Sequence, residues 1–272
     1  MKGHTLLAQT IGELGESERR LLPRRWQILG DLVLVNIWPQ IEHLKRQIGQ
    51  GLLQLYPRCR SVLWDKGVYG RLRTPEVEVI AGGATETLHK ENYCKFALDA
   101  RLVMFSAGNF AERLRMAKIG AGEAVLDMFS GIGQLCIPMA VHARPSSIVA
   151  IELNPAAYHY LKQNIALNRV NEIIRPVCGD CAEIKSTHQF DRVIMGHFDA
   201  RHYLQKAIQS LRCDGVLHYH EVVPSEAMRE LPFTRVAETA GRLARSAELL
   251  QTRKVKDYAP GIIHVVTDAK IG

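Results

Sequence analysis

Three acidic side chains stand at the ends of short apolar runs in the second half of the chain. Asp127 and Glu152 each end such a run, and Asp180 follows a third. If these runs are strands of a parallel sheet, the acids meet at its carboxyl edge, where open α/β sheets bind their ligands. Any one of these acids, taken alone, could have no role beyond capping the following helix. Three on consecutive strands together indicate a ligand with several hydrogen-bond donors.

A glycine loop follows the first acid, in the run Asp127-Met-Phe-Ser-Gly-Ile-Gly133. Glycines such as Gly131 let the backbone approach a ligand closely. The loop is neither the G-x-G-x-x-G of dinucleotide enzymes nor a phosphate loop, which argues against NAD and ATP. Glu152 suits two ribose hydroxyls. Asp180 suits an adenine amine, with the peptide of Cys181 facing the ring. The pattern therefore predicts an S-adenosylmethionine site.

Strand and helix patterns alternate through residues 101–272, which predicts a mostly parallel sheet with helices on both faces. We expect strands at 124–127, 147–152, 173–178, 192–195 and 215–220. We expect helices up to residue 142 and over 154–168, 200–211 and 225–250, then a terminal hairpin of 254–258 and 262–267.

Residues 1–100 have a different pattern, which predicts a small α+β domain, followed by the ligand-binding domain over 101–272. We expect a strand over 28–37, a helix over 39–56, and short strands at 61–64, 77–80, 85–89, 95–98 and 102–105.

The chain has a formal net charge of +7 in 272 residues, which hints at a polyanionic partner. The excess is spread over both halves, with local clusters at Arg19, Arg20, Arg24 and Arg25 and at Arg253, Lys254 and Lys256. Each cluster is either a solvated face or a phosphate-binding patch.

The sequence has no signal-peptide pattern and no apolar run of membrane-spanning length, so we expect a cytoplasmic protein without a membrane partner. Six cysteines are too few for a disulfide scaffold, and Cys178 and Cys181 have no second pair at metal spacing. We expect no metal site.

Several motifs resemble those of a known family. Residues 127–133, 151–161 and 164–168 resemble class I S-adenosylmethionine-dependent transferases, and more closely the branch that modifies tRNA position 37. The likeness continues upstream through 73–83 and 96–99 into 105–113. It implies a class I methyltransferase-like Rossmann fold with a seven-stranded sheet.

Two segments separate the members of this branch. The guanine N1-methyltransferases carry Phe-Ser-Pro-Arg, whose Arg assists methyl transfer, where this chain has Ala107-Gly108-Asn109. They also carry Asn-(Leu/Ile)-Pro after the fourth strand, where this chain has Met195-Gly196-His197. Both differences, together with His218-Tyr-His-Glu221, resemble the short archaeal aminocarboxypropyltransferases of wybutosine synthesis.

The resemblance implies transfer of the 3-amino-3-carboxypropyl group of S-adenosylmethionine to C7 of 4-demethylwyosine. The acceptor would be position 37, in the anticodon loop of tRNA(Phe), and the reaction would release methylthioadenosine. We expect the protein to be a monomer. The cofactor contacts that the motifs and the resemblance imply are Ser106, Arg113, Asp127, Gly131, Glu152, Asp180 and Cys181.

The roles of several residues stay open at this stage. Asn109 and His197 are candidate catalytic residues, whereas His218 and His220 are expected in a buried strand. Arg113 could instead form a surface ion pair with Glu112 or Asp99. The aromatic side chains that could stack on the acceptor base are Phe105, Phe110, Phe198 and Tyr219.

Three alternative functions are a guanine-37 N1-methyltransferase, a non-catalytic tRNA-binding protein that keeps the fold, and a small-molecule methyltransferase. The missing Arg argues against the first, and the three strand-end acids argue against the second. The N-terminal domain argues against the third.

Overall fold

The computed structural model describes residues 2–185 and 187–272. The chain divides into two compact units, Met1–Phe105 and Ser106–Gly272.

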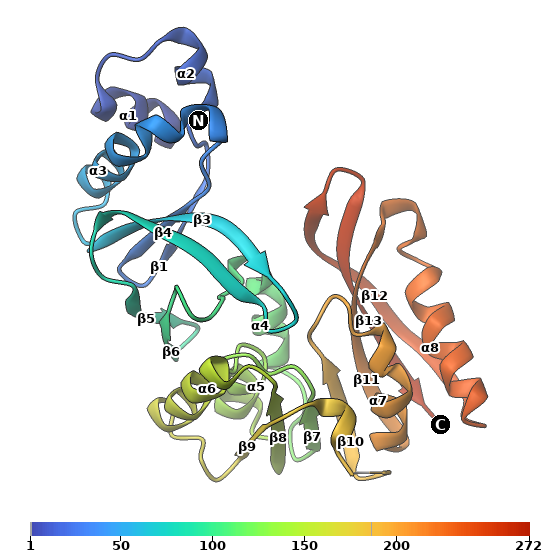
Figure 1. The fold of residues 1–272 in the computed structure, drawn as a ribbon. Helices are drawn as coiled ribbons and strands as arrows, with labels where there is room; N and C mark the ends of the chain where they lie inside the picture. The colour runs from blue at the N-terminus through green and yellow to red at the C-terminus, as the bar shows by residue number, and fades with distance from the viewer. Residues whose placement is uncertain (1, 186) are drawn as a thin grey trace. The chain divides into compact units, whose positions relative to one another are not determined.

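The second unit is built on a seven-stranded sheet with the order β12-β13-β11-β10-β7-β8-β9 (Figure 1). Its strands are β7 (Ala124–Asp127), β8 (Ser147–Glu152), β9 (Ile174–Cys178), β10 (Phe190–Met195), β11 (Leu211–Pro224), β12 (Ala247–Ala259) and β13 (Ile262–Ile271). Strands β9, β8, β7, β10 and β11 are parallel, and β13 lies antiparallel between β11 and β12. The fold class predicted from the sequence is confirmed.

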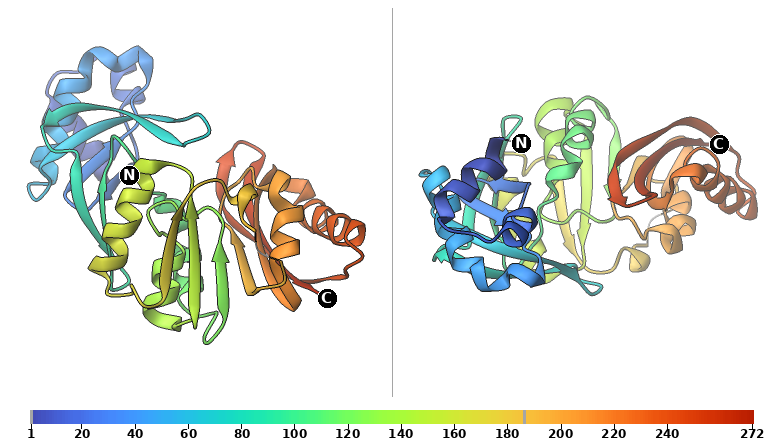
Figure 2. Two further views of the ribbon diagram at one scale, coloured as in Figure 1. Left: turned by 60° about the horizontal axis from the view of Figure 1, so that its bottom comes forward. Right: turned by 90° about the horizontal axis from the view of Figure 1, so that it is seen from above.

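Helices cover both faces of this sheet (Figures 1 and 2). They are α4 (Phe110–Met116), α5 (Cys136–Pro138), α6 (Pro155–Leu167), α7 (Leu204–Ser210) and α8 (Leu231–Arg242). The shorter turns are η2 (Ala107–Asn109), η3 (Met139–Ala143), η4 (Cys181–Glu183), η5 (Arg201–Tyr203) and η6 (Ser225–Ala227). In the described part of the chain, no helix is long and apolar enough to cross a membrane.

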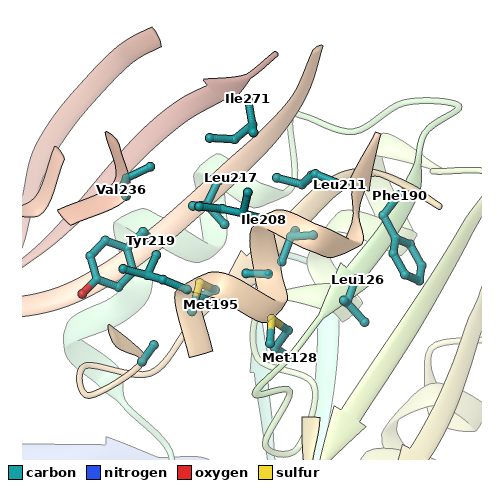
Figure 3. Close-up of a cluster of buried hydrophobic side chains, with 14 of the residues drawn as sticks. Leu126, Met128, Phe190, Met195, Ile208, Leu211, Leu217, Tyr219, Val236 and Ile271 are labelled. Atoms are coloured by element: carbon teal, nitrogen blue, oxygen red, sulfur yellow. The ribbon is translucent and has the colours of Figure 1, made fainter. Parts of the chain in front are cut away.

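The main core of this unit lies between the sheet and helices α7 and α8 (Figure 3). Leu217 and Tyr219 of β11 pack there with Ile208 of α7, and all three are fully buried. Because side chains alternate along a strand, His218 and His220 point to the opposite sheet face. They are buried as well, which confirms their expected place in a buried strand.

The first unit combines helices with a mixed sheet of order β1-β2-β3-β4 and a separate β5-β6 hairpin. Its elements are α1 (Lys2–Ile11), α2 (Glu16–Leu21), β1 (Trp26–Leu29), β2 (Leu32–Val35), η1 (Pro39–Leu44), α3 (Lys45–Leu55), β3 (Ser61–Tyr69), β4 (Thr74–Gly82), β5 (Glu86–Glu91) and β6 (Cys94–Asp99). The fully buried Leu7, Ile48 and Leu52 join α1 and α3 in one core with the sheet.

The single strand expected over 28–37 is wrong, because a two-residue turn divides it into β1 and β2. Leu29 pairs with Leu32, so the turn is Gly30-Asp31, with Gly30 at φ +60°. Glycine at the first turn position with a positive φ is the requirement of a type II′ hairpin.

Two further expectations from the sequence, one strand and the length of one helix, are wrong. No strand forms over 102–105, because the chain turns at Asp99, whose carbonyl accepts the amides of Leu102 and Val103. The helix expected over 225–250 covers only Leu231–Arg242. The helix ends at Arg242, Ala244 just beyond it has φ +54°, and β12 begins at Ala247.

Arg245 connects several elements of the second unit through hydrogen bonds to their backbone. Its guanidinium donates hydrogen bonds of 2.6 to 3.2 Å to five backbone carbonyls, those of Ile208, Leu211, Arg212, Ile271 and Gly272. The side chain thus joins α7, the start of β11 and the end of β13.

Replacing Arg245 should therefore destabilise the protein. Arg245→Met removes five hydrogen bonds, although the carbonyls of Ile208 and Leu211 keep a second partner, and should lower the free energy of unfolding by about 2–3 kcal/mol in urea titrations. The matched control is Arg242→Met, since that side chain is 76% exposed and pairs with the exposed Glu238. It should change stability by less than about 0.5 kcal/mol. Equal effects of the two substitutions would contradict this role.

Candidate cofactor and acceptor site

The three predicted acids meet at the carboxyl edge of the parallel strands. Asp127 ends β7, Glu152 ends the adjacent β8, and Asp180 follows β9, which pairs with β8. The glycine loop after β7 lies at the same edge.

Glu152 holds this edge together. Its Oε2 accepts the amide of Gly131 and its Oε1 accepts the amide of Asn154, both at 2.7 Å. Burial raises the pKa of Glu152, and the two amides oppose that shift. Each carboxylate oxygen has a second acceptor position, so Glu152 can hold the loop and still accept hydrogen bonds from hydroxyl groups of a ligand.

Asp127 is fully buried, and its Oδ1 accepts the amide of Phe129 at 3.3 Å. Burial raises the pKa of Asp127 to about 7, and the nearby charge of Glu152 acts in the same direction. Because this carboxyl group is inside the protein, it shapes the backbone of the loop rather than presenting oxygens at the surface.

Asp180 caps a short helical turn, since its Oδ1 accepts the amide of Ala182 at 2.9 Å. This is the capping role that the sequence left open, and capping uses only one of its carboxylate oxygens. Cys181 is buried in the main core, while Cys178 is exposed, and both are free thiols.

The glycines at this edge of the sheet have two different roles. Gly131 at φ +55° and Gly179 at φ +157° adopt conformations that disfavour side chains, and a Cβ on either would meet no atom within 4 Å. The space beside them is therefore open. Gly133 is needed for packing, because a Cβ there would lie 2.4 Å from Ile137 Cδ1.

Three side chains from different elements bind Ser106. Its amide donates to Oε1 of Gln134 at 3.0 Å, and its carbonyl accepts from Nη1 of Arg113 at 2.6 Å. Its hydroxyl accepts from Nζ of Lys256 at 2.8 Å. Arg113 is 1% exposed, so its side chain does not lie at the surface.

Asn109 lies at the end of η2, beside these residues in the chain, and its Oδ1 is buried with no hydrogen-bond partner within 2–185 and 187–272.

Buried charges fasten α4 to the sheet, and sequence reasoning missed them. Arg115 pairs with Glu112 on its own helix and with Asp268 of β13, with Nη1 2.9 Å from Oδ2. Asp268 also accepts from Arg253 of β12 at 3.2 Å and contacts His218. Asp268, Arg253 and His218 are far from α4 in the sequence, so no local pattern identifies the contacts that join them to the helix.

The pKa values follow from this network. Burial alone would raise the pKa of Glu112, but the nearby ring of His220 and the hydrogen bonds from Arg115 hold it below its usual range. Burial would likewise raise the pKa of Asp268, and its contact with His218 lowers it instead. Burial lowers the pKa of His218 to about 4, so its ring is neutral at pH 7.

The C-terminal basic cluster does not form one patch. Arg253 lies 3.2 Å from Asp268 and is 27% exposed, Lys254 pairs with Asp257 at 2.6 Å, and Lys256 contacts Ser106. The N-terminal cluster is different, because Arg19, Arg20, Arg24 and Arg25 are all exposed.

An aromatic row extends from the glycine loop to the tip of the β12–β13 hairpin. We use this name for Phe129, His197, Phe198 and Tyr258, whose successive ring centroids are 5.4, 4.8 and 5.6 Å apart. The amide of Asp199 donates to Nδ1 of His197 at 3.2 Å, so a neutral His197 carries its proton on Nε2. Among the described residues, no group of three His, Cys, Asp or Glu side chains could hold a metal ion.

Two family models match the chain. Residues 87–249 match the TRM5/TYW2 methyltransferase domain, and residues 7–85 match the TYW2 N-terminal domain. The chain belongs to the TRM5/TYW2 methyltransferase family. The resemblance stated from the motifs is confirmed.

Relatives within this family are similar over most of their length. The tRNA(Phe) (4-demethylwyosine(37)-C(7)) aminocarboxypropyltransferase of Methanocaldococcus jannaschii is 39% identical over 249 residues, which covers 90% of this chain and 97% of that protein. The crystal structure of P. horikoshii TYW2 in complex with MeSAdo is 32% identical, with a TM-score of 0.86 and 98% of each chain covered. The complex of aTrm5 and tRNALeu is 31% identical, with a TM-score of 0.83, and covers 94% of this chain and 74% of that chain.

The buried carboxyl group of Asp127 should make stability depend on pH. It titrates near pH 7 in the folded chain and near pH 4 in the unfolded chain. Between these values the folded chain binds the extra proton, so the free energy of unfolding falls as the pH rises. Asp127→Asn lacks this contribution, and its stability relative to the unchanged protein should rise by about 4 kcal/mol from pH 4 to pH 7. Urea titrations of the cofactor-free proteins measure it. A stability difference that stays constant with pH would contradict the prediction.

Proposed function

We propose that this chain transfers the 3-amino-3-carboxypropyl group of S-adenosylmethionine to C7 of 4-demethylwyosine in tRNA(Phe). The modified base is at position 37, in the anticodon loop, and methylthioadenosine is released. The observation that carries the proposal is the 39% identity to a relative named for this reaction, over nearly the full length of both proteins. The similar P. horikoshii structure contains MeSAdo, which is methylthioadenosine, the product that this transfer leaves.

The carboxyl edge of the sheet suits the adenosine part of the donor. The space beside Gly131 and Gly179 is open, and Glu152 has acceptor positions left for two ribose hydroxyls. Asp180 follows β9, caps the next turn through Oδ1, and carries a carboxylate that suits an adenine amine. We propose these residues, together with the backbone of Asp127 and Cys181, as the adenosine-binding set.

Ser106 and Arg113 suit the methionine arm of the donor. Arg113 is a buried guanidinium, a group that binds carboxylates through paired hydrogen bonds, and it already reaches the backbone of Ser106. Both lie next to Ala107-Gly108-Asn109, the segment in which this chain differs from the guanine N1-methyltransferases. We therefore propose that this segment determines how the arm is turned.

When bound, S-adenosylmethionine supplies a γ-carbon that its sulfonium already activates for attack. The chain therefore has to orient the donor and acceptor rather than generate a strong nucleophile, and orientation alone can accelerate such a reaction greatly. The proton that C7 loses can pass to water.

The aromatic row is our proposed platform for the acceptor base. Bases that are turned out of an RNA loop commonly stack on aromatic side chains. Phe129 connects the row to the glycine loop, and Tyr258, which is 54% exposed, ends it. Since Nδ1 of His197 accepts an amide, its Nε2 can donate to the edge of the base. We propose that His197 orients the base as a donor and does not remove its proton.

The exposed Arg19, Arg24 and Arg25 support a contribution of the N-terminal unit to tRNA binding, because guanidinium groups bind phosphates well. The C-terminal cluster does not support one of the same kind, since its charges are engaged within the unit.

The direct test is the identity of the small product. Incubating the chain with labelled S-adenosylmethionine and tRNA that carries 4-demethylwyosine should give methylthioadenosine and a base enlarged by the aminocarboxypropyl group. Nucleoside mass analysis measures both. Appearance of S-adenosylhomocysteine and a methylated base would show a methyltransferase instead, and absence of any transfer would favour a binding protein.

The platform makes a separate prediction. Tyr258→Ala should lower kcat/KM for tRNA by about 5- to 150-fold, since one base–aromatic stack contributes roughly 1–3 kcal/mol. The Kd of S-adenosylmethionine should not change, because Tyr258 lies at the far end of the row. Tyr258→Phe keeps the ring and is the matched control. If both variants lose the same activity, or if cofactor binding falls with it, stacking is not the role of this ring.

A further inference from the structure

Lys256 reaches the 106–109 segment because of a β-bulge. His264, Val266 and Asp268 share one face of β13, and residues paired across antiparallel strands lie on the same face. Lys256 pairs with His264, and Arg253 pairs with Val266. Arg253 and Lys256 are three residues apart, so in a regular strand their side chains would point to opposite faces. The irregularity between Lys254 and Lys256 instead places Arg253 and Lys256 on the same face of the sheet as Asp268. On that face Asp268 binds Arg115 of α4.

The chain makes room for this lysine. Nζ of Lys256 is 2.8 Å from Oγ of Ser106, and a Cβ on Gly108 would lie 2.7 Å from Cδ of Lys256. Gly108 is thus the residue type that lets the lysine stem cross the segment. Two cations, Lys256 and Arg113, contact Ser106 from two sides.

We propose that Lys256 is a second cation for the carboxylate of the methionine arm, beside Arg113. An ammonium has three donors, so Lys256 can keep its hydrogen bond to Ser106 while it binds a carboxylate oxygen. Ser106 and Lys256 are only half-buried, so a ligand can reach them. The proposal rests on the proposed donor site and extends it by one residue, contributed by the C-terminal hairpin.

A tRNA phosphate is the other anion that Lys256 could bind. The bulge argues for the carboxylate, because it turns Lys256 towards Ser106, while Lys254 on the same strand remains 46% exposed to solvent. The experiment separates these cases, because it contains no tRNA.

The test compares two ligands that differ by one group, S-adenosylmethionine and its decarboxylated form. Their Kd values are measured by calorimetry on the full chain and on Lys256→Met. The variant should bind S-adenosylmethionine roughly tenfold to a hundredfold more weakly, and the decarboxylated ligand within about threefold of the unchanged chain. Equal loss for both ligands, or no loss for either, overturns the proposal.

Three variants complete the experiment. Lys256→Arg should restore most of the affinity, and Lys254→Met, the matched control, should bind both ligands normally. Gly108→Ala should displace Lys256 and reproduce the selective loss, which keeps the proposal testable if Lys256→Met folds poorly. If the unchanged chain binds S-adenosylmethionine but transfers a methyl group, the proposed function is wrong. The role of Lys256 is then decided by the Kd values alone. If the unchanged chain binds neither ligand, both are overturned.

Discussion

Helix α4 is fixed to the sheet by charges that the fold buries, and the placement of the 106–113 segment depends on them. Arg115 joins Glu112 to Asp268, and Asp268 also accepts from Arg253. A buried charge is tolerated only when its partners are complete, because the desolvation cost of each ion is several kcal/mol. The network therefore specifies one position for α4, and with it the direction of Arg113.

This constraint explains how the C-terminal hairpin can contribute to the proposed site. Strand β13 enters the sheet antiparallel beside β11, so Asp268 lies directly across from His218. The bulge in β12 then adds Arg253 and Lys256 to the same face.

The parts of the site that were predictable from the sequence are those set by local pattern. Asp127, Glu152 and Asp180 could be placed because a strand followed by an acid or a glycine loop is a short-range signal, and parallel topology brings strand ends together. Lys256 could not be placed, since its face depends on a one-residue bulge that leaves the alternation of β12 ambiguous. The hairpin at Gly30-Asp31 was in principle readable, because glycine followed by aspartate between two apolar runs is a turn signal.

The two ends of the proposed donor site are built by different parts of the unit. Glu152 and Gly131 belong to β8 and the loop after β7, whereas Arg113 and Lys256 come from α4 and β12. The adenosine end therefore depends on the parallel half of the sheet, and the methionine end on the buried charges and the antiparallel half. Because these supports share few residues, substitutions in 106–109 and β12 can turn the methionine arm without disturbing the adenosine end. Such a division lets one fold present either a methyl group or a γ-carbon to the same acceptor position, since only the methionine end has to change.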